Sequence, residues 1–479
     1  KYQYTMGKSF FDSGMKDKRA VFNLFYRKAP DTNNWAVVSG ITEVLEVIKG
    51  LNCGDESFFE QFLPGEEYKE VRQYFAKMKF TGNVYAMREG EIAFPTQPII
   101  TIEAPVIEGQ VLETPLLSIM NHQMAVATKA SRVTRSTNKP VSEFGSRRAH
   151  GPWAAIYGGK AAFIGGCANS SNIISGTKFG FPPTGTMAHS YVTSFGCSIK
   201  GEFQAFDTYI KTHKSEVLIL LIDTYDTLRC GVKNAIKAFK ENGIDDNYPY
   251  GYGIRLDSGD LTYLSVKCRE MLDEAGLKKC KIFATNALDE YLITELERQG
   301  CQVDSYGVGD AIATSKHNPC FGNVFKLVQI DDAPVLKRSE DRIKLINPGF
   351  QITYRIIQNG KFKVDVTCLR GDDLSKDIEA GKTITVRDER DRFKSMTFEE
   401  GKYEFRTLQQ QIVKDGEITY IDRSIQEKQT YYKENLAHLD DTQKRLINPH
   451  YYKCDISDAL YDLKNKLIDN LVKEIEELD

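Results

Sequence analysis

The chain has 479 residues, of which 63 are Lys or Arg and 66 are Asp or Glu, so its formal net charge is −3. This near-neutral balance gives no general electrostatic attraction for DNA or RNA, although local basic clusters would still suit small anions. The length is sufficient for two or three domains with a large core.

The longest aliphatic run is VLILLI at 217–222, which is far too short to span a membrane. No charged segment followed by an apolar stretch opens the chain, so secretion is unsupported and a cytoplasmic location is expected. The ten cysteines show no CxxC pair and no Cys/His spacing typical of zinc sites. We therefore expect reduced and mostly buried thiols.

The first 130 residues are expected to form short antiparallel strands and one long helix. The runs GNVYAMREGEIAF at 82–94 and PIITIEAPVIEG at 98–109 have the pattern of such strands. The segment LLSIMNHQMAVATKASRVTR at 116–135 predicts a long helix that leads into the next part of the chain.

Between 216 and 309 apolar strands alternate with helical segments. The strands are expected at 216–223, 251–257, 281–286 and 302–309, and the helices between them at 230–243, 260–276 and 288–300. Buried strands that alternate with helices predict parallel α/β structure, here with polar residues at the carboxyl end of each strand. The pattern fits an α/β barrel or an open doubly wound sheet, because both place their ligands at that end.

The last part of the chain mixes strands with a terminal helix. ITYRIIQNGKFKVDVTCL at 352–369 predicts a hairpin with an Asn-Gly turn. The charge-rich segment at 370–393 is expected to be solvated, and 456–479 predicts an amphipathic helix with Ser or Asp near its cap.

His189 stands in the segment GTMAHS at 185–190, after a stretch at 165–183 that is rich in Gly, Ser and Asn. Small residues let a large anionic ligand approach the backbone closely. A histidine in this run of small and hydroxyl-bearing residues, which includes Thr186, can serve as a nucleophile or a general base. The alternative is a structural histidine in a loop.

The segment IRLDSGDL at 254–261 follows a predicted strand and gathers charged and small residues, namely Arg255, Asp257, Ser258, Gly259 and Asp260. Carboxylates there can orient ribose hydroxyls or hold Mg²⁺ through water, and an arginine can bind a phosphate or carboxylate with two hydrogen bonds. The alternative, which is compatible with the first, is that Ser258 or Asp257 caps the helix that begins near Asp260.

The segment GVGDA at 307–311 also follows a predicted strand. Gly307 and Gly309 would let backbone N–H groups point at a phosphate. Asp310 would be unfavourable beside a phosphate, so its side chain should face away, or this loop is not the contact. Two further acids, Asp223 and Asp226, follow an earlier strand and are expected to have a supporting role.

These segments together resemble those of nicotinate phosphoribosyltransferases, which are type II phosphoribosyltransferases. The likeness extends over most of the chain and keeps the family's order of motifs: YQYTM at 2–6, RAVFNLFYRKAP at 19–30, EFGSRRAHG at 143–151, SSN at 170–172, GTMAHS, IRLDSGDL, ATNALDE at 284–290, DSYGVGDAIATS at 304–315, GNVFKLV at 322–328, KRSEDRIKLINPGF at 337–350 and NPHYYKCDIS at 448–457. The resemblance implies an irregular α/β barrel at 131–350. It also implies a second α/β (α+β) domain, in which the C-terminal segment 351–479 packs back on the N-terminal segment 1–130.

The resemblance further implies the reaction. Phosphoribosyl would pass from phosphoribosyl pyrophosphate to nicotinate, coupled to ATP, giving nicotinate mononucleotide and pyrophosphate in NAD biosynthesis or salvage. Mg²⁺ would accompany ATP and phosphoribosyl pyrophosphate, although no metal ligands are predicted. ATP would phosphorylate His189, and Arg255 and Asp257 would act beside it in a homodimer with shared active sites.

Residues for the pyridine ring are also implied by the resemblance. Phe144 and Arg147 would stack on the ring and contact the anionic substrate, and Tyr2 would reach its opposite face across the dimer interface. Without the family, Phe144 fits core packing equally well, and the pair Arg147–Arg148 fits ordinary surface charge.

The closest alternative is nicotinamide phosphoribosyltransferase, which shares several of these motifs and has an aspartate close to the position of Ser171. An acid there would repel a carboxylate substrate, so neutral serines favour nicotinate. Quinolinate enzymes are shorter and richer in cationic site residues. A non-catalytic scaffold on the same barrel predicts the loss of His189, Asp257 or the arginine pair, and all of these are present.

Overall fold

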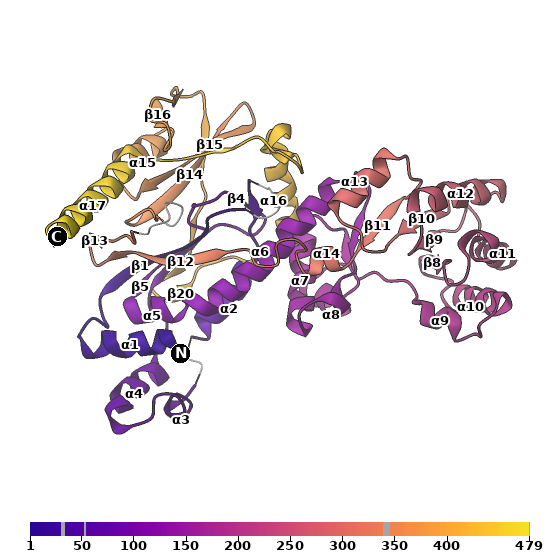
Figure 1. Cartoon of the computed structure of the whole chain (residues 1–479), viewed down its shortest axis with the longest axis horizontal. Helices are drawn as coiled ribbons and strands as arrows, with labels where there is room; N and C mark the ends of the chain where they lie inside the picture. Colours follow the sequence, from indigo (N-terminus) through magenta and orange to yellow (C-terminus); the bar gives the residue numbers. More distant parts are fainter. Residues whose placement is uncertain (30–33, 52–53, 339–344, 479) are drawn as a thin grey trace. The chain divides into compact units, whose positions relative to one another are not determined.

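The computed structural model describes residues 1–29, 34–51, 54–338 and 345–478. Part of the 337–350 motif therefore lies outside the described residues. The chain divides into two compact units (Figure 1). The first combines Lys1–Ala125, Cys320–Arg423 and Thr430–Asp479, and the second consists of Val126–Pro319 and Ser424–Gln429.

The second unit contains a six-stranded sheet in which every neighbouring pair is parallel. From one edge the order is β8 (Leu218–Leu221), β9 (Tyr252–Leu256), β10 (Lys281–Ala284), β11 (Ser305–Val308), β6 (Val141–Glu143) and β7 (Asn169–Ser170). The order follows the chain around a ring and never reverses, whereas a doubly wound sheet reverses at a switch point. The predicted barrel is therefore confirmed, as a curled half-barrel with β7 and β8 at its edges.

The helices of this unit follow its strands as the sequence pattern predicts. Strand β8 is buried throughout, and the aliphatic runs of β9 and β10 alternate with helices that lie beside them (Figure 1). The helices are α7 (Pro152–Ile164), α8 (Ile173–Phe179), α9 (His189–Thr193), α10 (Ile199–Thr212), α11 (Val232–Glu241), α12 (Leu261–Glu274), α13 (Glu290–Arg298) and α14 (Asp310–Ala313). The long helix expected at 116–135 is confirmed as α6 (Glu113–Arg135), which connects the two units in sequence.

The first unit is built on a seven-stranded antiparallel sheet. Its order is β13 (Ala333–Pro334), β12 (Asn323–Ile330), β1 (Arg19–Tyr26), β5 (Ile100–Pro105), β3 (Asn83–Ala86), β19 (Gln410–Lys414) and β20 (Glu417–Ile418). The predicted antiparallel strands are confirmed, but the last residues of the 98–109 run belong to helix α5 (Val106–Val111). The other helices around this sheet are α1 (Tyr2–Asp12), α2 (Ile41–Lys49), α3 (Glu56–Glu60) and α4 (Lys69–Lys77).

A four-stranded sheet completes the first unit, in the order β18 (Glu404–Thr407), β14 (Gln351–Gln358), β15 (Lys361–Leu369) and β21 (Lys453–Ile456). The hairpin β14–β15 turns at Asn359 and Gly360, which both have positive φ, as the Asn-Gly signal predicts. Two short ribbons pair β16 (Ile384–Arg387) with β17 (Ser395–Phe398) and β2 (Ala36–Val37) with β4 (Ile92–Ala93).

The charged segment 370–393 is less solvated than predicted. It contains helix α15 (Asp373–Glu379) and strand β16, whose Ile378, Ile384 and Val386 are buried in a small core. Three aliphatic residues suffice to anchor it although most of its side chains are charged.

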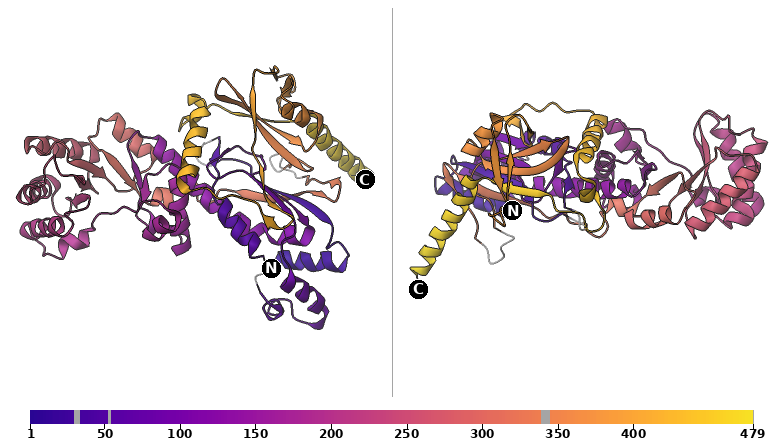
Figure 2. Two further views of the ribbon diagram at one scale, coloured as in Figure 1. Left: turned by 180° about the vertical axis from the view of Figure 1, so that it is seen from behind. Right: turned by 90° about the horizontal axis from the view of Figure 1, so that it is seen from above.

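The chain ends in two helices, α16 (Ile425–His438) and α17 (Asp458–Glu476). Ser457 caps α17 by accepting from the Leu460 N–H, as predicted. The last turns of α17 project from the unit (Figure 2).

Two bulk expectations can be compared with the described residues. Nine of the ten cysteines lie there as free thiols, and six of these are buried, which confirms the expectation of reduced and mostly buried thiols for this part. None of the described helices is both long and apolar enough to cross a bilayer.

Candidate active site

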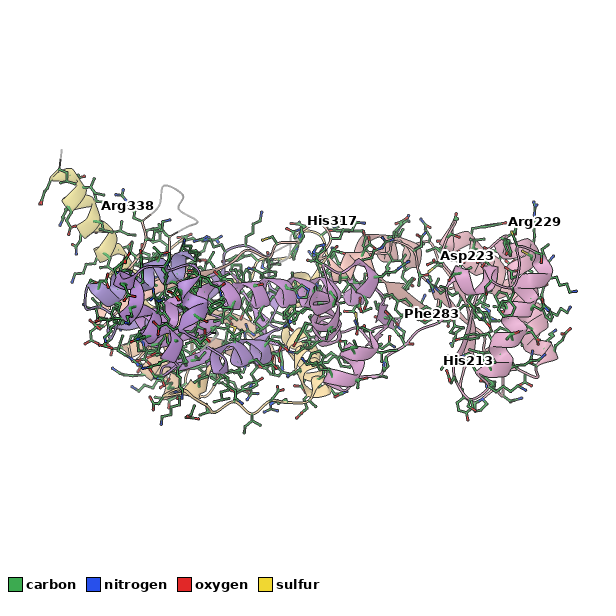
Figure 3. All side chains as sticks on the ribbon, turned by 90° about the horizontal axis from the view of Figure 1, so that it is seen from below. His213, Asp223, Arg229, Phe283, His317 and Arg338 are labelled. Carbon is green, nitrogen blue, oxygen red and sulfur yellow. The ribbon has the colours of Figure 1, made fainter. Side chains whose placement is uncertain are left out.

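Polar or small residues follow five of the six strands of the half-barrel, and an aromatic residue, Phe144, follows β6. Because the strands are parallel, their carboxyl ends share one edge of the sheet, which is where barrel enzymes place their sites. From β8 to β7 the residues that follow the strands are Asp223, Asp257, Thr285, Gly309, Phe144 and Ser171. Asp223, two residues after the end of β8, and Phe283, in β10, are labelled in Figure 3.

His189 and Asp223 form the first pair at this edge. The His189 Nε2 atom lies 3.1 Å from Asp223 Oδ1, and the Asp223 side chain is only 2% exposed whereas that of His189 is 43% exposed. The Ser258 hydroxyl donates to the other carboxylate oxygen, Oδ2. A buried carboxylate that accepts from one ring nitrogen fixes the tautomer and orientation of the imidazole. It leaves Nδ1 of a half-exposed ring available for chemistry.

Arg255, Asp257 and Thr285 form a second cluster beside the first. Arg255 Nη2 donates to Asp257 Oδ1 at 3.1 Å, and Arg255 Nε donates to the Thr285 hydroxyl at 2.9 Å. That hydroxyl donates in turn to the same Asp257 oxygen. Arg255 Nη1 reaches Thr186 Oγ1 at 3.1 Å and the Met187 carbonyl at 3.3 Å, which ties the loop before His189 to the end of β9.

In the turn after β9, the residue that caps helix α12 is a different one from the residues that belong to the two clusters. Gly259 has φ +79°, a left-handed conformation that side chains rarely adopt. Asp260 caps α12 by accepting from the Tyr263 N–H at 3.0 Å. The expectation that Ser258 or Asp257 caps this helix is therefore wrong. The helix begins one residue after Asp260, whose side chain is the one that reaches the unpaired N–H groups. This leaves Asp257 and Ser258 to the clusters described above.

Glu143 organises the opposite end of the sheet edge. Its buried carboxylate accepts from the Gly145 N–H and from the Ser170 hydroxyl, the latter at 2.6 Å. Its backbone carbonyl accepts from the Ser171 N–H at 2.9 Å. Burial raises the pKa of the Glu143 carboxyl above its usual value. The hydrogen bonds that the carboxylate accepts from Ser170 and from the Gly145 N–H offset part of this rise. One side chain thus holds the turns that follow β6 and β7.

Phe144 lies between these turns and the neighbouring strands. Its N–H donates to the Val308 carbonyl at 2.8 Å, and its ring is nearly parallel to that of Phe283, at 6.1 Å between centroids. A Cβ atom on Gly307 would come within 2.7 Å of both the Phe144 ring and the Thr285 methyl group. Glycine is therefore required at 307 by the close approach of two side chains, and a phosphate contact there stays a prediction.

Several other predicted residues lie at or near this edge. Gly309 precedes the short helix α14, which Asp310 opens. Arg147 is exposed in the 3₁₀ turn Ser146–Arg148 that follows Phe144. Asp226 caps the next helical turn by accepting from the Leu228 and Arg229 N–H groups, so of the two acids after β8 only Asp223 joins the site. Asp223 contacts His189 directly, which is a closer involvement than the supporting role predicted for it.

Tyr2 belongs to the first unit. It opens helix α1, its side chain is exposed, and its hydroxyl lies 3.4 Å from that of Thr114. Its predicted role requires a second copy of the chain and stays a prediction.

Family profiles and sequence relatives point to one family. Profiles of the nicotinate phosphoribosyltransferase N-terminal and C-terminal domains match residues 1–121 and 350–464. The nicotinate phosphoribosyltransferase of Bacillus subtilis is 36% identical over 99% of this chain and 96% of its own length. That of Dictyostelium discoideum is 30% identical over 99% of this chain and 89% of its own length. The chain belongs to the nicotinate phosphoribosyltransferase family.

A solved structure supports the fold of this nicotinate phosphoribosyltransferase family member. Human nicotinic acid phosphoribosyltransferase superposes with a TM-score of 0.82 over 98% of this chain and 99% of that one, at 24% identity. The two-domain architecture that the motifs imply is thus found in an experimentally solved relative.

Two residues at the edge were missed by sequence reasoning about this family member. Glu143 stands directly before Phe144, and an acid at the end of a buried strand was the signal that could have found it. Thr285 stands in the ATNALDE motif, inside the strand expected at 281–286, whereas β10 ends at Ala284 and leaves Thr285 as the first residue after it. Asn286 and Ala287 both have positive φ, a strained conformation for residues other than glycine that often accompanies functional sites.

Proposed function

We propose that this protein transfers phosphoribosyl from phosphoribosyl pyrophosphate to nicotinate, giving nicotinate mononucleotide and pyrophosphate in NAD biosynthesis. The proposal rests on family membership and on one observation, that two groups of side chains lie at the same edge of the sheet. The Arg255–Asp257 pair, which suits a ribose and its phosphates, shares a sheet edge with Phe144, which suits a flat ring, and Thr285 lies between them.

In this reaction the protein mainly has to position the two substrates and stabilise the charge that develops on them. The bond between the anomeric carbon and the pyrophosphate oxygen breaks, and the pyridine nitrogen forms the new bond to that carbon. Asp257 Oδ1 is occupied by Arg255 and Thr285, whereas Oδ2 makes no hydrogen bond within the described residues and is free to accept from a ribose hydroxyl. A preorganised carboxylate also stabilises the positive charge that develops on the ribose ring.

The choice of nicotinate over nicotinamide is assigned to the turn after β7. Ser171 is held there by its backbone hydrogen bond to Glu143, and its side chain carries no charge. An anionic substrate is better tolerated by a neutral hydroxyl than by an acid. Arg147, exposed in the facing turn, would supply the positive charge for the carboxylate.

We infer that His189 is the group that ATP phosphorylates. With Nε2 directed at Asp223, Nδ1 is the nitrogen that would attack the γ-phosphorus. The N–P bond would form as the bond to the ADP oxygen breaks, while the Nε2 proton stays on the hydrogen bond to Asp223. The added negative charge beside the Arg255 cluster would couple ATP use to the phosphoribosyl site.

Mg²⁺ is proposed to arrive with the substrates. The described residues contain no group of three His, Cys, Asp or Glu side chains arranged to hold a metal ion. Mg²⁺ commonly keeps several waters and binds through one or two carboxylates plus substrate phosphates, so this mode does not require three protein ligands. When bound, the ion would supply positive charge to the leaving pyrophosphate.

We also propose a homodimer in which Tyr2 completes the site of its partner. Mixing Tyr2→Ala subunits with Asp257→Asn subunits tests this directly. If sites are shared, the mixture gains activity that neither variant has alone, because one of the two sites in a mixed dimer carries neither defect. A strict average of the two parent activities contradicts the shared site.

Product analysis tests the proposed reaction. The purified protein is incubated with Mg²⁺ and phosphoribosyl pyrophosphate plus either nicotinate or nicotinamide, with and without ATP. We expect nicotinate mononucleotide, more of it with ATP, and little product from the amide. Formation of the amide mononucleotide alone would identify the alternative enzyme, and no product from either base would refute the transferase.

A further inference from the structure

Thr285 is buried, with 4% of its surface exposed, at the point where β10 ends in the middle of the sheet. Its N–H donates to the Leu256 carbonyl at 2.9 Å, which continues the ladder between β10 and β9 by one step. The two sides of its branched side chain face different parts of the site. We propose that Thr285 is a positioning residue that sets the phosphoribosyl side with its hydroxyl and the ring side with its methyl group. This inference rests on the proposed function.

The hydroxyl is shared between two charged groups. It accepts from Arg255 Nε at 2.9 Å and donates to Asp257 Oδ1, with the Leu256 carbonyl as a longer second acceptor at 3.3 Å. Its one proton and one of its lone pairs are therefore used. Arg255 and Asp257 also contact each other directly, at 3.1 Å. The hydroxyl therefore closes a three-membered ring of hydrogen bonds that fixes both side chains. Asp257 Oδ2 is then held in one direction, toward the place where a ribose hydroxyl would bind.

The methyl group faces the other way, toward the neighbouring strand. The Thr285 methyl group and the Phe144 ring both lie close to Gly307 in β11. A Cβ atom placed on Gly307 would be 2.7 Å from each of them. Glycine leaves the space in which these two groups lie. The methyl group and the Phe144 ring thus border the same space beside Gly307, which is the geometry by which the methyl group would position the ring, and Phe144 is the residue that the proposed function assigns to the pyridine ring.

Two substitutions separate these contacts. Thr285→Val removes the hydroxyl and keeps both branches of the side chain. We expect kcat/KM for phosphoribosyl pyrophosphate to fall about 10- to 100-fold, the range for a lost hydrogen bond to a charged group, with KM for nicotinate within about twofold. Thr285→Ser keeps the hydroxyl and removes the methyl group. We expect KM for nicotinate to rise about three- to fivefold, the scale of one buried methyl group, with the phosphoribosyl parameters unchanged.

A matched control and a double variant make the test specific. Thr262→Val removes another threonine hydroxyl hydrogen bond in the same unit, to Gln299 on the outer helices, and should leave both constants unchanged. If Thr285 acts through Asp257, then Thr285→Val should cost little more in an Asp257→Asn background, so the two effects should not add.

The outcomes distinguish this inference from the proposed function. Wild-type protein is first shown to form nicotinate mononucleotide, and failure at that step refutes the function whatever Thr285 does. With an active wild type, equal losses in both constants for both variants would show a merely structural role, and wild-type constants in Thr285→Val would show no role. If Thr285→Val does not fold, Thr285→Cys is compared with Thr285→Ser instead. Both lack the methyl group, and the thiol is a weaker hydrogen-bonding group than the hydroxyl, so the difference between these two variants isolates the hydroxyl.

Discussion

Replacing Asp223 by Asn should disable the ATP-dependent step while leaving the fold intact. The Asp223 carboxylate is 2% exposed and accepts from both His189 Nε2 and the Ser258 hydroxyl. An asparagine has nearly the same shape, but only its oxygen can accept. If that oxygen keeps the hydrogen bond from Ser258, the amide NH₂ group faces Nε2 and becomes the donor.

That exchange reverses the tautomer of His189. Nε2 would become the acceptor and Nδ1 would carry the proton, so the nitrogen proposed to attack ATP would lose its lone pair. Losses from the wrong histidine tautomer or a missing acid–base partner are about 10²- to 10⁴-fold. At about 1.36 kcal/mol per tenfold, this raises the barrier by about 3 to 5 kcal/mol.

The assay follows ATP hydrolysis and phosphohistidine formation, together with nicotinate mononucleotide formed with and without ATP. Asp226→Asn is the matched control. Asp226 lies in the same loop but caps a helical turn, which asparagine does equally well, and its only ion pair among the described residues is an exposed one with Arg229. We expect Asp223→Asn to lose ATP hydrolysis and to keep some ATP-independent transfer, as His189→Ala should. ATP hydrolysis within about threefold of wild type in folded Asp223→Asn, or an equal loss in Asp226→Asn, would refute the reasoning.

Four further variants test the remaining assignments. Asp257→Asn should lower the transfer rate about 10²-fold with little change in melting temperature, and a destabilised protein with a normal rate per folded molecule would contradict this. Ser171→Asp should raise KM for nicotinate more than for nicotinamide, and an equal rise for both bases would argue against the pocket. Glu143→Gln should raise KM for nicotinate about tenfold with KM for phosphoribosyl pyrophosphate unchanged, since an amide cannot accept from both Ser170 and the backbone; matched changes in both constants would count against it. Burial raises the pKa of Asp455 in the folded protein to about 6. The folded state therefore holds this proton more tightly than the unfolded state, which adds up to about 3 kcal/mol to the free energy of unfolding at a pH below about 4. This contribution is lost as the pH rises from about 4 to 6. Urea denaturation of Asp455→Asn should therefore show a smaller loss of stability over this range, and an unchanged pH profile would disprove it.

The elements of the half-barrel could be predicted from the sequence because their signals are local. The apolar run at 216–223 and the capped helix after Asp260 are specified by neighbours a few residues away, and the structure has them within a few positions. The segment 370–393 was misjudged because its high charge hides three aliphatic residues, whose burial depends on a sheet formed elsewhere in the chain. Charge content describes the average side chain, whereas packing depends on the few that face the core.

Candidate residues could be found from sequence, but their partners could not. His189 and Asp223 are 34 positions apart, and Arg255 and Thr285 are 30 apart, so no motif spans either contact. Arg255 and Thr285 meet because neighbouring parallel strands bring their carboxyl ends to one edge, whereas His189 reaches Asp223 from the connection between β7 and β8, at the start of α9. The capping residue after β9 was misassigned for a related reason, since Asp257, Ser258 and Asp260 are all good caps and only the start of α12 decides among them.

The strand order also explains how one sheet edge accommodates three different tasks. Of the two residues proposed for phosphoryl transfer, Asp223 follows β8 and His189 opens α9. The residues proposed for the ribose and its phosphates lie at the end of β9, and those proposed for the ring, Phe144 and Ser171, follow β6 and β7. Strand β10 lies between the second and third groups, and its end contributes only a buried threonine and a strained turn. Neighbouring strands are about 5 Å apart, so each task has its own strand end while every group stays within reach of the next. A residue at the end of β10 lies between the group proposed for the ribose and the group proposed for the ring, and borders both. Thr285 suits this position because its side chain has one polar and one apolar branch.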